Sequence, residues 1–486
     1  TDEWVRISWD EAASLIAGEM RRLKDAYGNE AFHDFGQSGS TKLLHGRAWV
    51  QRLFNRFGGY TTVTGSYSLP GCSIAHKYLW GLTNSQQDFW DLLNADHLLL
   101  WSSNAVVTGQ QPSSDWYLTL AREKSDREGK RIVLVDPWFN RTGQALVDEW
   151  VPIRFQTDEA MMLAMLHVLF TEPRYRSKVD RGWIEARSVG IFPRQGGGTL
   201  EDPTVPADDC LQYYVLGWDE NGRPATDPSH KNYPPKTPEW AARETGVPAE
   251  TIVRVAAEYA DNSVFMGTGK KAAFYTGWGM NRRAYGENPY VLAAAIATVT
   301  KNIGVSGGGP GFTAGGNPPP IGSSGAGPGR NPIADQCTFD VSNRALAIAG
   351  EPVRNEHTFE WRAYNIRMLW GAGGNVVNQN NDLNRTLRAI RDRIECFVMS
   401  DVTWSVSARY ADIVLPICTT QELNDITSGT SQHLVFANKC IEPLFESKPD
   451  MEACRLVAER LGIGEGFVPD TDDKMLRAVW AGTSSW

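Results

Sequence analysis

A loop rich in glycine, serine and threonine, residues 58–73, holds the densest group of side chains that could do chemistry. It places several hydroxyls, among them those of Tyr67 and Ser68, close to the thiol of Cys72. The pair Pro70–Gly71 stops regular structure from continuing through the segment, and loops held by a rigid scaffold often carry functional groups. The same composition also fits a plain connector, so the rest of the chain has to decide between the two.

The other cysteines and histidines form no recognisable ligand motif. The seven cysteines are scattered without a C-x-x-C pair, and the eight histidines include no H-E-x-x-H. Only His76 lies near the loop, a few residues after Ser68. It is a candidate for proton transfer, although an ordinary structural histidine would look the same in the sequence.

Length and composition describe a globular protein of several domains. With 486 residues, the usual domain size of roughly 100 to 200 residues predicts two to four domains. The net charge of −9 argues against nucleic acid as a partner, because phosphate binding needs a basic surface. The sequence has no apolar run of about 18 residues, so we expect no direct insertion into a membrane, and no signal peptide is visible.

The chain repeats one design. An apolar strand, His97–Trp101, is followed by Asn104, and much later Arg367–Trp370 is followed by Asn375. The matching order of strand, tryptophan and asparagine indicates two copies of one unit.

Each copy then continues in the same way. A second strand ends in an acid, Asp136 in the first copy and Asp401 in the second, and a similar closing phrase follows, Val147–Ile153 and Ala411–Ile417. Strands that alternate with helices predict doubly wound α/β units, whose ligands lie beyond the carboxyl ends of the strands.

The two sets of asparagine and aspartate are candidates for binding two nucleotides. A carboxylate at the end of a strand can accept paired hydrogen bonds from ribose hydroxyls or from the edge of a guanine, and exposed backbone N–H groups can hold a pyrophosphate. We therefore interpret the repeat as two similar nucleotide sites. The alternative is a duplicated scaffold that has kept no ligand.

Three further segments could add polar ligand groups. Thr157 and Asp158 begin a helix, although helix capping alone would explain both residues. A strand is expected to lead into a glycine turn at Gly267 and Gly269. Residues 277–283 combine exposed backbone donors with two guanidinium groups, a combination that suits phosphate.

Several short phrases, in this order along the chain, resemble the dimethyl sulfoxide reductase family of molybdenum or tungsten bis-pterin guanine dinucleotide oxidoreductases. The phrases are Ile7–Ala12, Gly65–Ser68, Trp101–Asn104, Val135–Pro137, Thr157–Asp158, Gly277–Gly279, Asn375–Gln379 and Ala411–Pro416. Each phrase is weak alone, but the ordered set spans nearly the whole chain. The resemblance also explains the internal repeat, since such enzymes hold two guanine dinucleotides related by pseudo-symmetry.

The resemblance implies roles for individual residues. In the serine-ligated branch a G-x-Y-S phrase supplies the metal's oxygen ligand, which here falls on Ser68, with Cys72 as the rival because thiolate-ligated relatives exist. The expected catalytic residues are Tyr67, Ser68 and His76. The residues expected to bind the cofactor are Trp101, Ser103, Asn104, Asp136, Thr157, Asp158, Gly267, Gly269, Gly277, Trp278, Gly279, Asn281, Gly373, Asn375, Asn378, Gln379, Ser400 and Asp401.

The repeat and the resemblance together predict the fold. We expect two pseudo-symmetric, doubly wound (Rossmann-like) α/β domains with the cofactor between them, plus a partial third region. Residues 1–65 with 262–415 are expected to form the domain that binds one guanine dinucleotide, and residues 66–261 the domain that binds the other. Residues 416–486 would be the partial third region.

Three departures from the family pattern shape these expectations. The family's N-terminal cysteine run for a [4Fe-4S] cluster is not found, so a cluster is expected only in a missing N-terminal segment or in a partner. A further C-terminal domain is not found either, so we expect the sequence to be a piece of a longer polypeptide. Residues Gly36–Ser40 stand where sulfoxide- and N-oxide-reducing relatives place aromatic rings, which predicts a roomier funnel, with Trp80 nearby, for a larger or aromatic substrate.

The resemblance implies a molybdenum-dependent reductase of anaerobic respiration. Its substrate would be an oxygenated organic compound: a sulfoxide, an N-oxide or a phenolic hydroxyl compound. It would work with an iron–sulfur electron-transfer subunit and a membrane-anchor subunit, on the periplasmic or extracytoplasmic side, with a cytoplasmic location as the alternative. Two other functions stay open, a structural or electron-relay relative without metal and a reductase of inorganic oxyanions.

Overall fold

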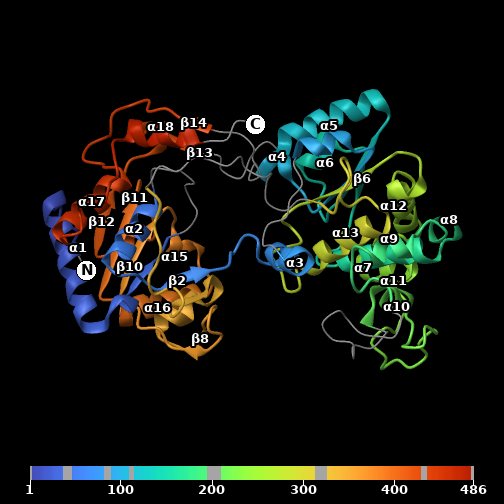
Figure 1. The fold of residues 1–486 in the computed structure, drawn as a ribbon, viewed down its shortest axis with the longest axis horizontal. Coiled ribbons are helices and arrows are strands. Elements are labelled where there is room, and N and C mark those ends of the chain that lie inside the picture. The colour runs from blue at the N-terminus through green and yellow to red at the C-terminus, as the bar shows by residue number, and fades with distance from the viewer. Residues whose placement is uncertain are drawn as a thin grey trace. The chain divides into compact units, whose positions relative to one another are not determined.

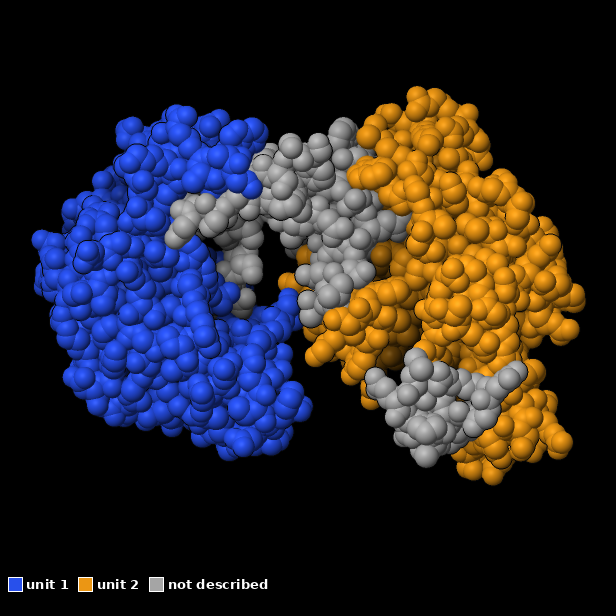
Figure 2. Space-filling model, in the orientation of Figure 1, with its two compact units in different colours: residues 1–67, 318–486 blue, residues 68–317 orange. Residues whose placement is uncertain are grey.

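A computed structural model of the chain divides into two units, each built around a four-stranded parallel sheet (Figure 1). Unit 1 comprises residues 1–67 and 318–486, and unit 2 comprises residues 68–317 (Figure 2). The structure describes residues 3–36, 46–81, 89–108, 114–193, 209–311, 326–427 and 435–482, with the side chains of 89, 114–117, 376 and 427 left out.

Unit 2 is doubly wound. Its sheet has the strand order β5-β4-β3-β6. The strands are β3 (His97–Trp101), β4 (Arg131–Val135), β5 (Glu149–Val151) and β6 (Ala272–Thr276). The helices are α3 (Pro70–Trp80), α4 (Ala105–Thr108), α5 (Ser114–Glu128), α6 (Arg141–Leu146), α7 (Asp158–Thr171), α8 (Pro173–Arg176), α9 (Arg181–Glu185), α10 (Leu211–Leu216), α11 (Pro238–Thr245), α12 (Ala249–Asp261) and α13 (Asn288–Val299).

Both faces of this sheet are covered, because successive side chains of a strand point to opposite sides. Leu99 and Trp101 of β3 belong to a buried cluster with residues of α7, α12 and α13. Leu98 and Leu100 belong to a separate cluster with residues of α5 and α6. The continuous apolar run of β3 is therefore the mark of a strand buried on both faces.

Unit 1 follows the same plan. Its main sheet has the order β1-β10-β11-β12. The strands of unit 1 are β1 (Phe32–Asp34), β2 (Thr62–Thr64), β7 (Thr338–Asp340), β8 (Val353–Arg354), β9 (Trp361–Arg362), β10 (Met368–Ala372), β11 (Cys396–Asp401), β12 (Ile413–Pro416), β13 (Asp425–Thr427) and β14 (Val435–Ala437). Its helices are α1 (Trp9–Tyr27), α2 (Ala48–Phe57), α14 (Arg344–Ala349), α15 (Val376–Gln379), α16 (Leu383–Arg393), α17 (Asp450–Arg460) and α18 (Asp472–Gly482).

The faces of the unit 1 sheet are again packed on different helices. Trp370 of β10 and Val398 of β11 share a buried cluster with residues of α1, α2 and α17. Leu369 and Phe397 share another cluster with residues of α14 and α16. The two doubly wound units confirm the predicted fold class and the repeat seen in the sequence.

The repeat extends to hydrogen bonds. The carboxylate of Asp148 accepts from the N–H of Ile132, and the carboxylate of Asp412 accepts from the N–H of Phe397, each at 2.7 Å. Each aspartate belongs to a closing phrase, so the phrase ties its own strand to the preceding one. The two phrases therefore have the same structural function in the two units.

The first unit boundary lies after residue 67 rather than after residue 65, and two larger segments also lie in other units than expected. Residues 262–317 lie in unit 2, because β6 pairs in parallel with β3 and α13 packs on the same sheet. Residues 416–486 lie in unit 1 rather than in a separate region, because α17 packs against the core formed with α1 and α2. In both cases a segment outside the repeat completes a unit.

The strand expected before Gly267 is not formed. Residues Val264–Met266 form a 3₁₀ turn and β6 begins only afterwards, so Gly267 and Gly269 precede the strand.

Within the described part of the chain, no helix is long and apolar enough to cross a membrane.

We expect the central strands to carry the stability of each unit. Leu369 of β10 is fully buried, so Leu369→Ala should lower the free energy of unfolding by about 3 kcal/mol through the lost apolar contacts and the cavity left behind. Chemical denaturation would measure the change. The matched control is Leu15→Ala on the exposed face of α1, which should change it by less than about 0.5 kcal/mol; equal losses in both variants would contradict the assignment of β10 to the core.

Candidate cofactor site

A cavity of about 350 Å³ lies at the carboxyl ends of the central strands of unit 2. Six predicted cofactor-binding residues line it together: Ser103, Asn104, Asp136, Gly277, Trp278 and Gly279. The cavity is also lined by Ser102, Ala105, Thr108, Trp138, Asn140, Tyr275 and Arg282. The position agrees with the rule that α/β sheets bind ligands beyond their carboxyl ends.

Asn104 connects the loop after β3 to the first turn of α6. Its side-chain Oδ1 accepts hydrogen bonds from the N–H and the hydroxyl of Thr142, at 3.4 and 3.3 Å. The hydroxyl oxygen of Thr142 in turn accepts from the N–H of Val106 at 3.1 Å. The amide oxygen is thus used within the protein, and the Nδ2 group is the part of Asn104 that can meet a ligand.

Unit 1 contains the same connection. Oδ1 of Asn375 accepts from the hydroxyl and the N–H of Ser407, at 2.6 and 3.0 Å. The hydroxyl oxygen of Ser407 accepts from the N–H of Val377 at 3.0 Å. We call each arrangement an asparagine–hydroxyl latch, formed by Asn104 with Thr142 and by Asn375 with Ser407.

A second cavity, of about 500 Å³, lies beside the latch of unit 1. Four predicted residues line it: Gly373, Asn375, Ser400 and Asp401. The other lining residues are Gly46, Gly374, Val402, Thr403, Ser405, Ile417, Cys418, Thr419, Thr420, Gln421, Leu423 and Asp450. Both units therefore have a cavity at the equivalent end of the sheet.

Asp136 is the acid of the unit 2 cavity. Its Oδ1 accepts from the N–H of Trp138 at 2.9 Å. Burial raises the pKa of Asp136 to about 6, and the nearby carboxylate of Asp158 adds to the rise. The hydrogen bond from Trp138 does not fully offset the cost of burying the Asp136 charge. A ligand that brings further hydrogen-bond donors to this carboxylate is therefore favoured.

Trp101 of β3 and Trp370 of β10 are tied to polar groups inside the protein. The indole N–H of Trp101 donates to Asp158 at 2.7 Å, and that of Trp370 donates to Ser400 at 2.9 Å. Asp158 also faces Arg283 at 3.4 Å, with only 6% of its side chain exposed. The described structure thus places Trp101 and Asp158 behind the unit 2 cavity, and neither they nor Thr157 line it.

The Ser68 loop is fixed by Asn281. This side chain is fully buried; its Nδ2 donates to the carbonyl of Ser68 at 2.5 Å and its Oδ1 accepts from the N–H of Cys72 at 2.8 Å. Arg282 donates to the same Ser68 carbonyl at 3.3 Å. Asn281 was predicted to bind the cofactor; here its amide clamps the entry into α3, and it lies outside the lining of the unit 2 cavity.

The remaining candidates near this loop have different surroundings. Cys72 is 2% exposed and packs in the apolar core of unit 2, whereas Ser68 is half-buried. His76 is buried too, which lowers its pKa. The hydroxyl of Tyr67 donates to the carbonyl of Val341 at 2.7 Å, and burial raises its pKa. In the described structure, His76 is thus buried and the Tyr67 hydroxyl is bonded to the backbone.

Some predicted residues are not brought to the cavities. Gly267 and Gly269 precede β6 and so lie at the opposite end of that strand. Asn378 and Gln379 are exposed on α15 and do not line the unit 1 cavity. Of the turn Gly36–Ser40, only Gly36 belongs to the described residues.

Several residues that build the cavities were missed in the sequence. They are Trp138, Asn140, Thr142 and Ser407. Arg282, by contrast, is one of the two guanidinium groups that the sequence predicted to suit a phosphate. One signal could have found two of the missed residues: Thr142 follows Asp136 at the same spacing as Ser407 follows Asp401. Trp138 carried no signal, because its exposure of 74% on the cavity rim is visible only in the folded chain.

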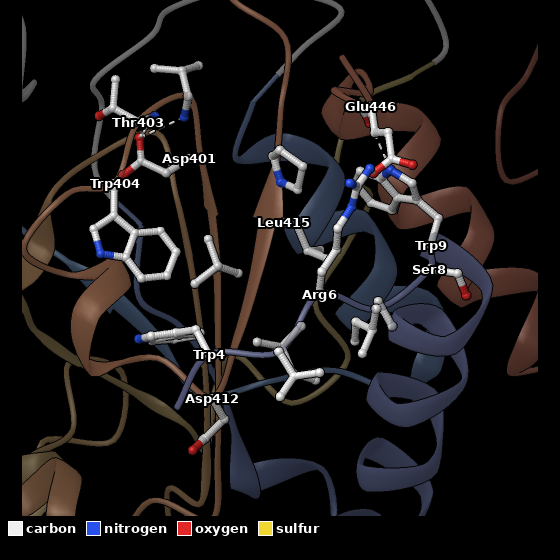
Figure 3. Close-up of a pocket in the computed structure, with 17 residues that line it drawn as sticks. Trp4, Arg6, Ser8, Trp9, Asp401, Thr403, Trp404, Asp412, Leu415 and Glu446 are labelled. Atoms are coloured by element: carbon white, nitrogen blue, oxygen red, sulfur yellow. Dashed lines mark hydrogen bonds and ion pairs between the residues drawn. The ribbon is translucent and has the colours of Figure 1, made fainter. Parts of the chain in front are cut away.

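A third cavity, of about 570 Å³, lies between the N-terminal segment and β12 in unit 1 (Figure 3). The rings of Trp4 and Trp404 meet edge to face in it, with centroids 4.6 Å apart. Asp401 lines both this cavity and the cavity beside the latch of unit 1. Its Oδ1 accepts from the N–H of Val402 at 2.8 Å, which fixes the carboxylate on the loop between the two.

The residues of the paired cavities fit the two halves of a guanine dinucleotide cofactor. Both volumes lie in the range of small-molecule sites, and each cavity offers an acid for a base edge, an asparagine and backbone donors. At Gly277 a Cβ would come within 2.0 Å of the carbonyl of Ser102, so only glycine lets these two loops meet. Among the described residues, no three His, Cys, Asp or Glu side chains gather into a metal site.

Comparison with known proteins identifies the family. The sequence model of molybdopterin oxidoreductases matches residues 1–460. The chain belongs to the molybdopterin oxidoreductase family. Family membership implies a molybdenum–pterin cofactor, as the sequence phrases predicted.

The relatives include reductases of oxygenated compounds. Dimethyl sulfoxide reductase DmsA of Escherichia coli is 30% identical over 98% of this chain and 57% of the relative. Trimethylamine-N-oxide reductase of Haemophilus influenzae is 29% identical over 96% of this chain and 55% of the relative. The chain thus spans about half the length of these relatives. Acetylene hydratase from Pelobacter acetylenicus shares the fold, with a TM-score of 0.65 and 17% identity over 99% of this chain and 62% of that one.

The raised pKa of Asp136 gives a prediction about pH. Ionising this carboxyl costs more in the folded than in the unfolded protein, so the wild type should lose stability relative to Asp136→Asn as the pH rises from about 4 to about 6. Above that range the variant should stay the more stable protein, and below it the two should converge. Thermal unfolding of the ligand-free proteins between pH 4 and 8 would measure this. Glu123→Gln on the exposed surface of α5 is the control; a pH-independent difference for Asp136→Asn would contradict the burial of its charge.

Proposed function

We propose that this protein is the catalytic part of a molybdenum-dependent reductase of an oxygenated organic compound. The observation that carries the proposal is the pair of cavities, one in each unit, each with an asparagine–hydroxyl latch and an aspartate at the end of the second central strand. A cofactor with two guanine dinucleotides needs two such sites in one chain. A duplicated scaffold without ligands would have no need to keep the acid and the latch in both copies.

Each half of the cofactor would be held by the same kinds of groups. We assign the guanine edges to Asp136 and Asp401, whose carboxylates can accept paired N–H donors. In unit 2, Arg282 and the backbone around Gly277 and Gly279 would hold the pyrophosphate. Trp138 would cover the base, because its exposed ring lies on the rim of the same cavity.

Ser68 is the proposed protein ligand of the metal. The Asn281 clamp fixes its backbone on both sides of the turn into α3, so the hydroxyl is presented by a rigid segment. The rival Cys72 has its side chain in the apolar core of unit 2, where a thiolate would be poorly solvated. When bound, the molybdenum cofactor would supply the two-electron chemistry that removes oxygen from the substrate.

The substrate and the electron source follow as further parts of the proposal. The names of two relatives support a sulfoxide or an N-oxide, and a phenolic hydroxyl compound remains the third class to test. A reduction of this kind consumes two electrons, and we propose that an iron–sulfur partner subunit supplies them. An anchor subunit and an extracytoplasmic location complete the proposal. The competing functions are a metal-free structural or electron-relay protein and a reductase of inorganic oxyanions.

Metal and nucleotide content test the cofactor assignment. We expect the matured protein to contain molybdenum or tungsten with two guanine nucleotides per metal, released by acid hydrolysis and measured by chromatography. Asp136→Ala and Asp401→Ala should each lower the nucleotide content, because the cofactor loses a hydrogen-bond partner at a cost of about 1 to 3 kcal/mol. Matured protein without either metal would reject the enzyme, and full occupancy in both variants would show that the repeat serves the fold alone.

Replacement of the proposed ligand tests the site. With reduced viologen as the electron donor, Ser68→Ala should lower the rate of sulfoxide, N-oxide and phenolic substrate reduction more than about 100-fold. This is a larger loss than replacing a residue that only hydrogen-bonds to a metal ligand would cause. The melting temperature of the variant should be unchanged, because the residue lies in a half-buried loop. Ser66→Ala, two residues earlier in the same loop, is the matched control. Wild-type turnover in Ser68→Ala would refute the ligand, and turnover of nitrate or selenate alone would refute the organic substrate.

A further inference from the structure

Arg344, the first residue of α14, is a buried cation without a counter-ion. Only 1% of the residue is exposed. Among the described residues, no carboxylate lies within ion-pair distance of it, and its guanidinium lies over the ring of Phe35 at 5.3 Å. Burial lowers the pKa of Arg344 to about 10, so the side chain is still charged at neutral pH.

Two of the hydrogen-bond donors at this cation are also unused. Arg344 donates from Nη1 to Oδ1 of Asn380 at 3.3 Å, while its Nε is buried without an acceptor. Nδ2 of Asn380 is likewise buried without an acceptor in the described structure. Two neighbouring side chains therefore hold N–H groups that nothing accepts, an arrangement that costs free energy in a folded protein.

The nearby acid does not compensate for this charge. Asp34 acts electrostatically on Arg344, but its carboxylate is already occupied by Arg47, by Nε2 of Gln51 at 2.7 Å and by the N–H of Gly36 at 3.0 Å. The buried group of Asp34, Arg47 and Arg344 thus keeps one positive charge in excess. A buried charge that lacks a partner is strongly unfavourable unless a ligand supplies one.

The unused donors lie next to the segment that ends in Ser68. Oδ1 of Asn380 is 3.3 Å from the hydroxyl of Tyr67, which precedes Ser68 in the chain. Asn380 as a whole is half-buried and Asn381 beside it is exposed, so the unused donors lie one residue from the surface of unit 1. The donors and the excess charge occur at one place in unit 1.

We propose that Arg344 and Asn380 form a receptor for an oxyanion. The ligand would carry one negative charge or more and at least two acceptor oxygens, one for Nε of Arg344 and one for Nδ2 of Asn380. Two sources share this chemistry: a phosphate of the proposed nucleotide-bearing cofactor, and a free inorganic oxyanion. The proposal concerns binding alone and stands whether or not the protein reduces a sulfoxide or an N-oxide.

The variant that tests it is Asn380→Asp, which keeps the shape of the side chain and supplies the missing anion from within the protein. Without added oxyanion, the variant should melt at a higher temperature than the wild type. Arg344→Met removes the charge and should leave the melting temperature equal or higher, as expected for a buried cation replaced by an apolar chain. Lower melting temperatures in both variants would show that Arg344 is a structural core cation and would overturn the proposal.

Inorganic phosphate is the probe for binding. It is added to the full chain, and chloride at the same ionic strength is the control. In cofactor-free protein phosphate should raise the melting temperature of the wild type by roughly 2 to 4 °C at a tenfold excess over the dissociation constant. The rise should vanish in Asn380→Asp and Arg344→Met and persist in Arg385→Met, which removes a half-exposed arginine from the neighbouring α16. Equal rises in all four proteins, or none in the wild type, would refute the receptor.

The protein as isolated separates the two sources. If the cofactor's phosphate fills the receptor, phosphate should no longer stabilise the isolated wild type, and isolated Asn380→Asp should contain less guanine nucleotide than wild type. If a free oxyanion is the ligand, phosphate should stabilise both preparations and Asn380→Asp should keep its nucleotide. Neither measurement depends on turnover, so failure of the reductase proposal and failure of this one can be told apart.

Discussion

The asparagine–hydroxyl latch is the interaction on which both halves of the candidate site depend. In each unit one amide oxygen, from Asn104 or Asn375, holds the loop after the first central strand against the segment that follows the second. In unit 2, Nδ2 of Asn140 donates to the carbonyl of Ser103 at 2.9 Å and ties the same two segments together. These bonds help to fix the distance between the aspartate of one segment and the backbone donors of the other. A hydroxyl partner, Thr142 or Ser407, suits the task because it accepts and donates at the same time.

Around the latches the protein keeps polar groups in states that do not favour stability. Asp136 has a raised pKa because its charge is buried, and Arg344 is a buried cation with unused donors. The indole N–H groups of Trp101 and Trp370 each have an acceptor, on Asp158 and Ser400. A site that is prepared for a charged ligand has to carry such imbalance before the ligand arrives, and the fully packed sheets can tolerate it.

Much of the candidate site could be predicted from the sequence, and the reason is the repeat. Asn104, Asp136 and their equivalents stand at fixed offsets from apolar strands, so two copies of a weak pattern supported each other. The clamp formed by Asn281 on Ser68 could not be found in this way, because the two residues are 213 positions apart and belong to no repeat. From the sequence we predicted that Asn281 binds the cofactor. A polar residue in a glycine-rich segment does not show whether its partner is a ligand or another part of the chain.

The central strands can be found from the sequence alone, since β3, β4, β10 and β11 are short apolar runs buried on both faces. The doubly wound class can be found in the same way, because such strands alternate with helices. The segments that complete each sheet are known from the folded chain alone: β1 from the start of the chain pairs with β10, and β6 from its middle pairs with β3. The physical reason is that local hydrophobic pattern records how deeply a strand is buried, whereas the choice of a distant partner depends on hydrogen bonds and packing that form only when the chain has folded.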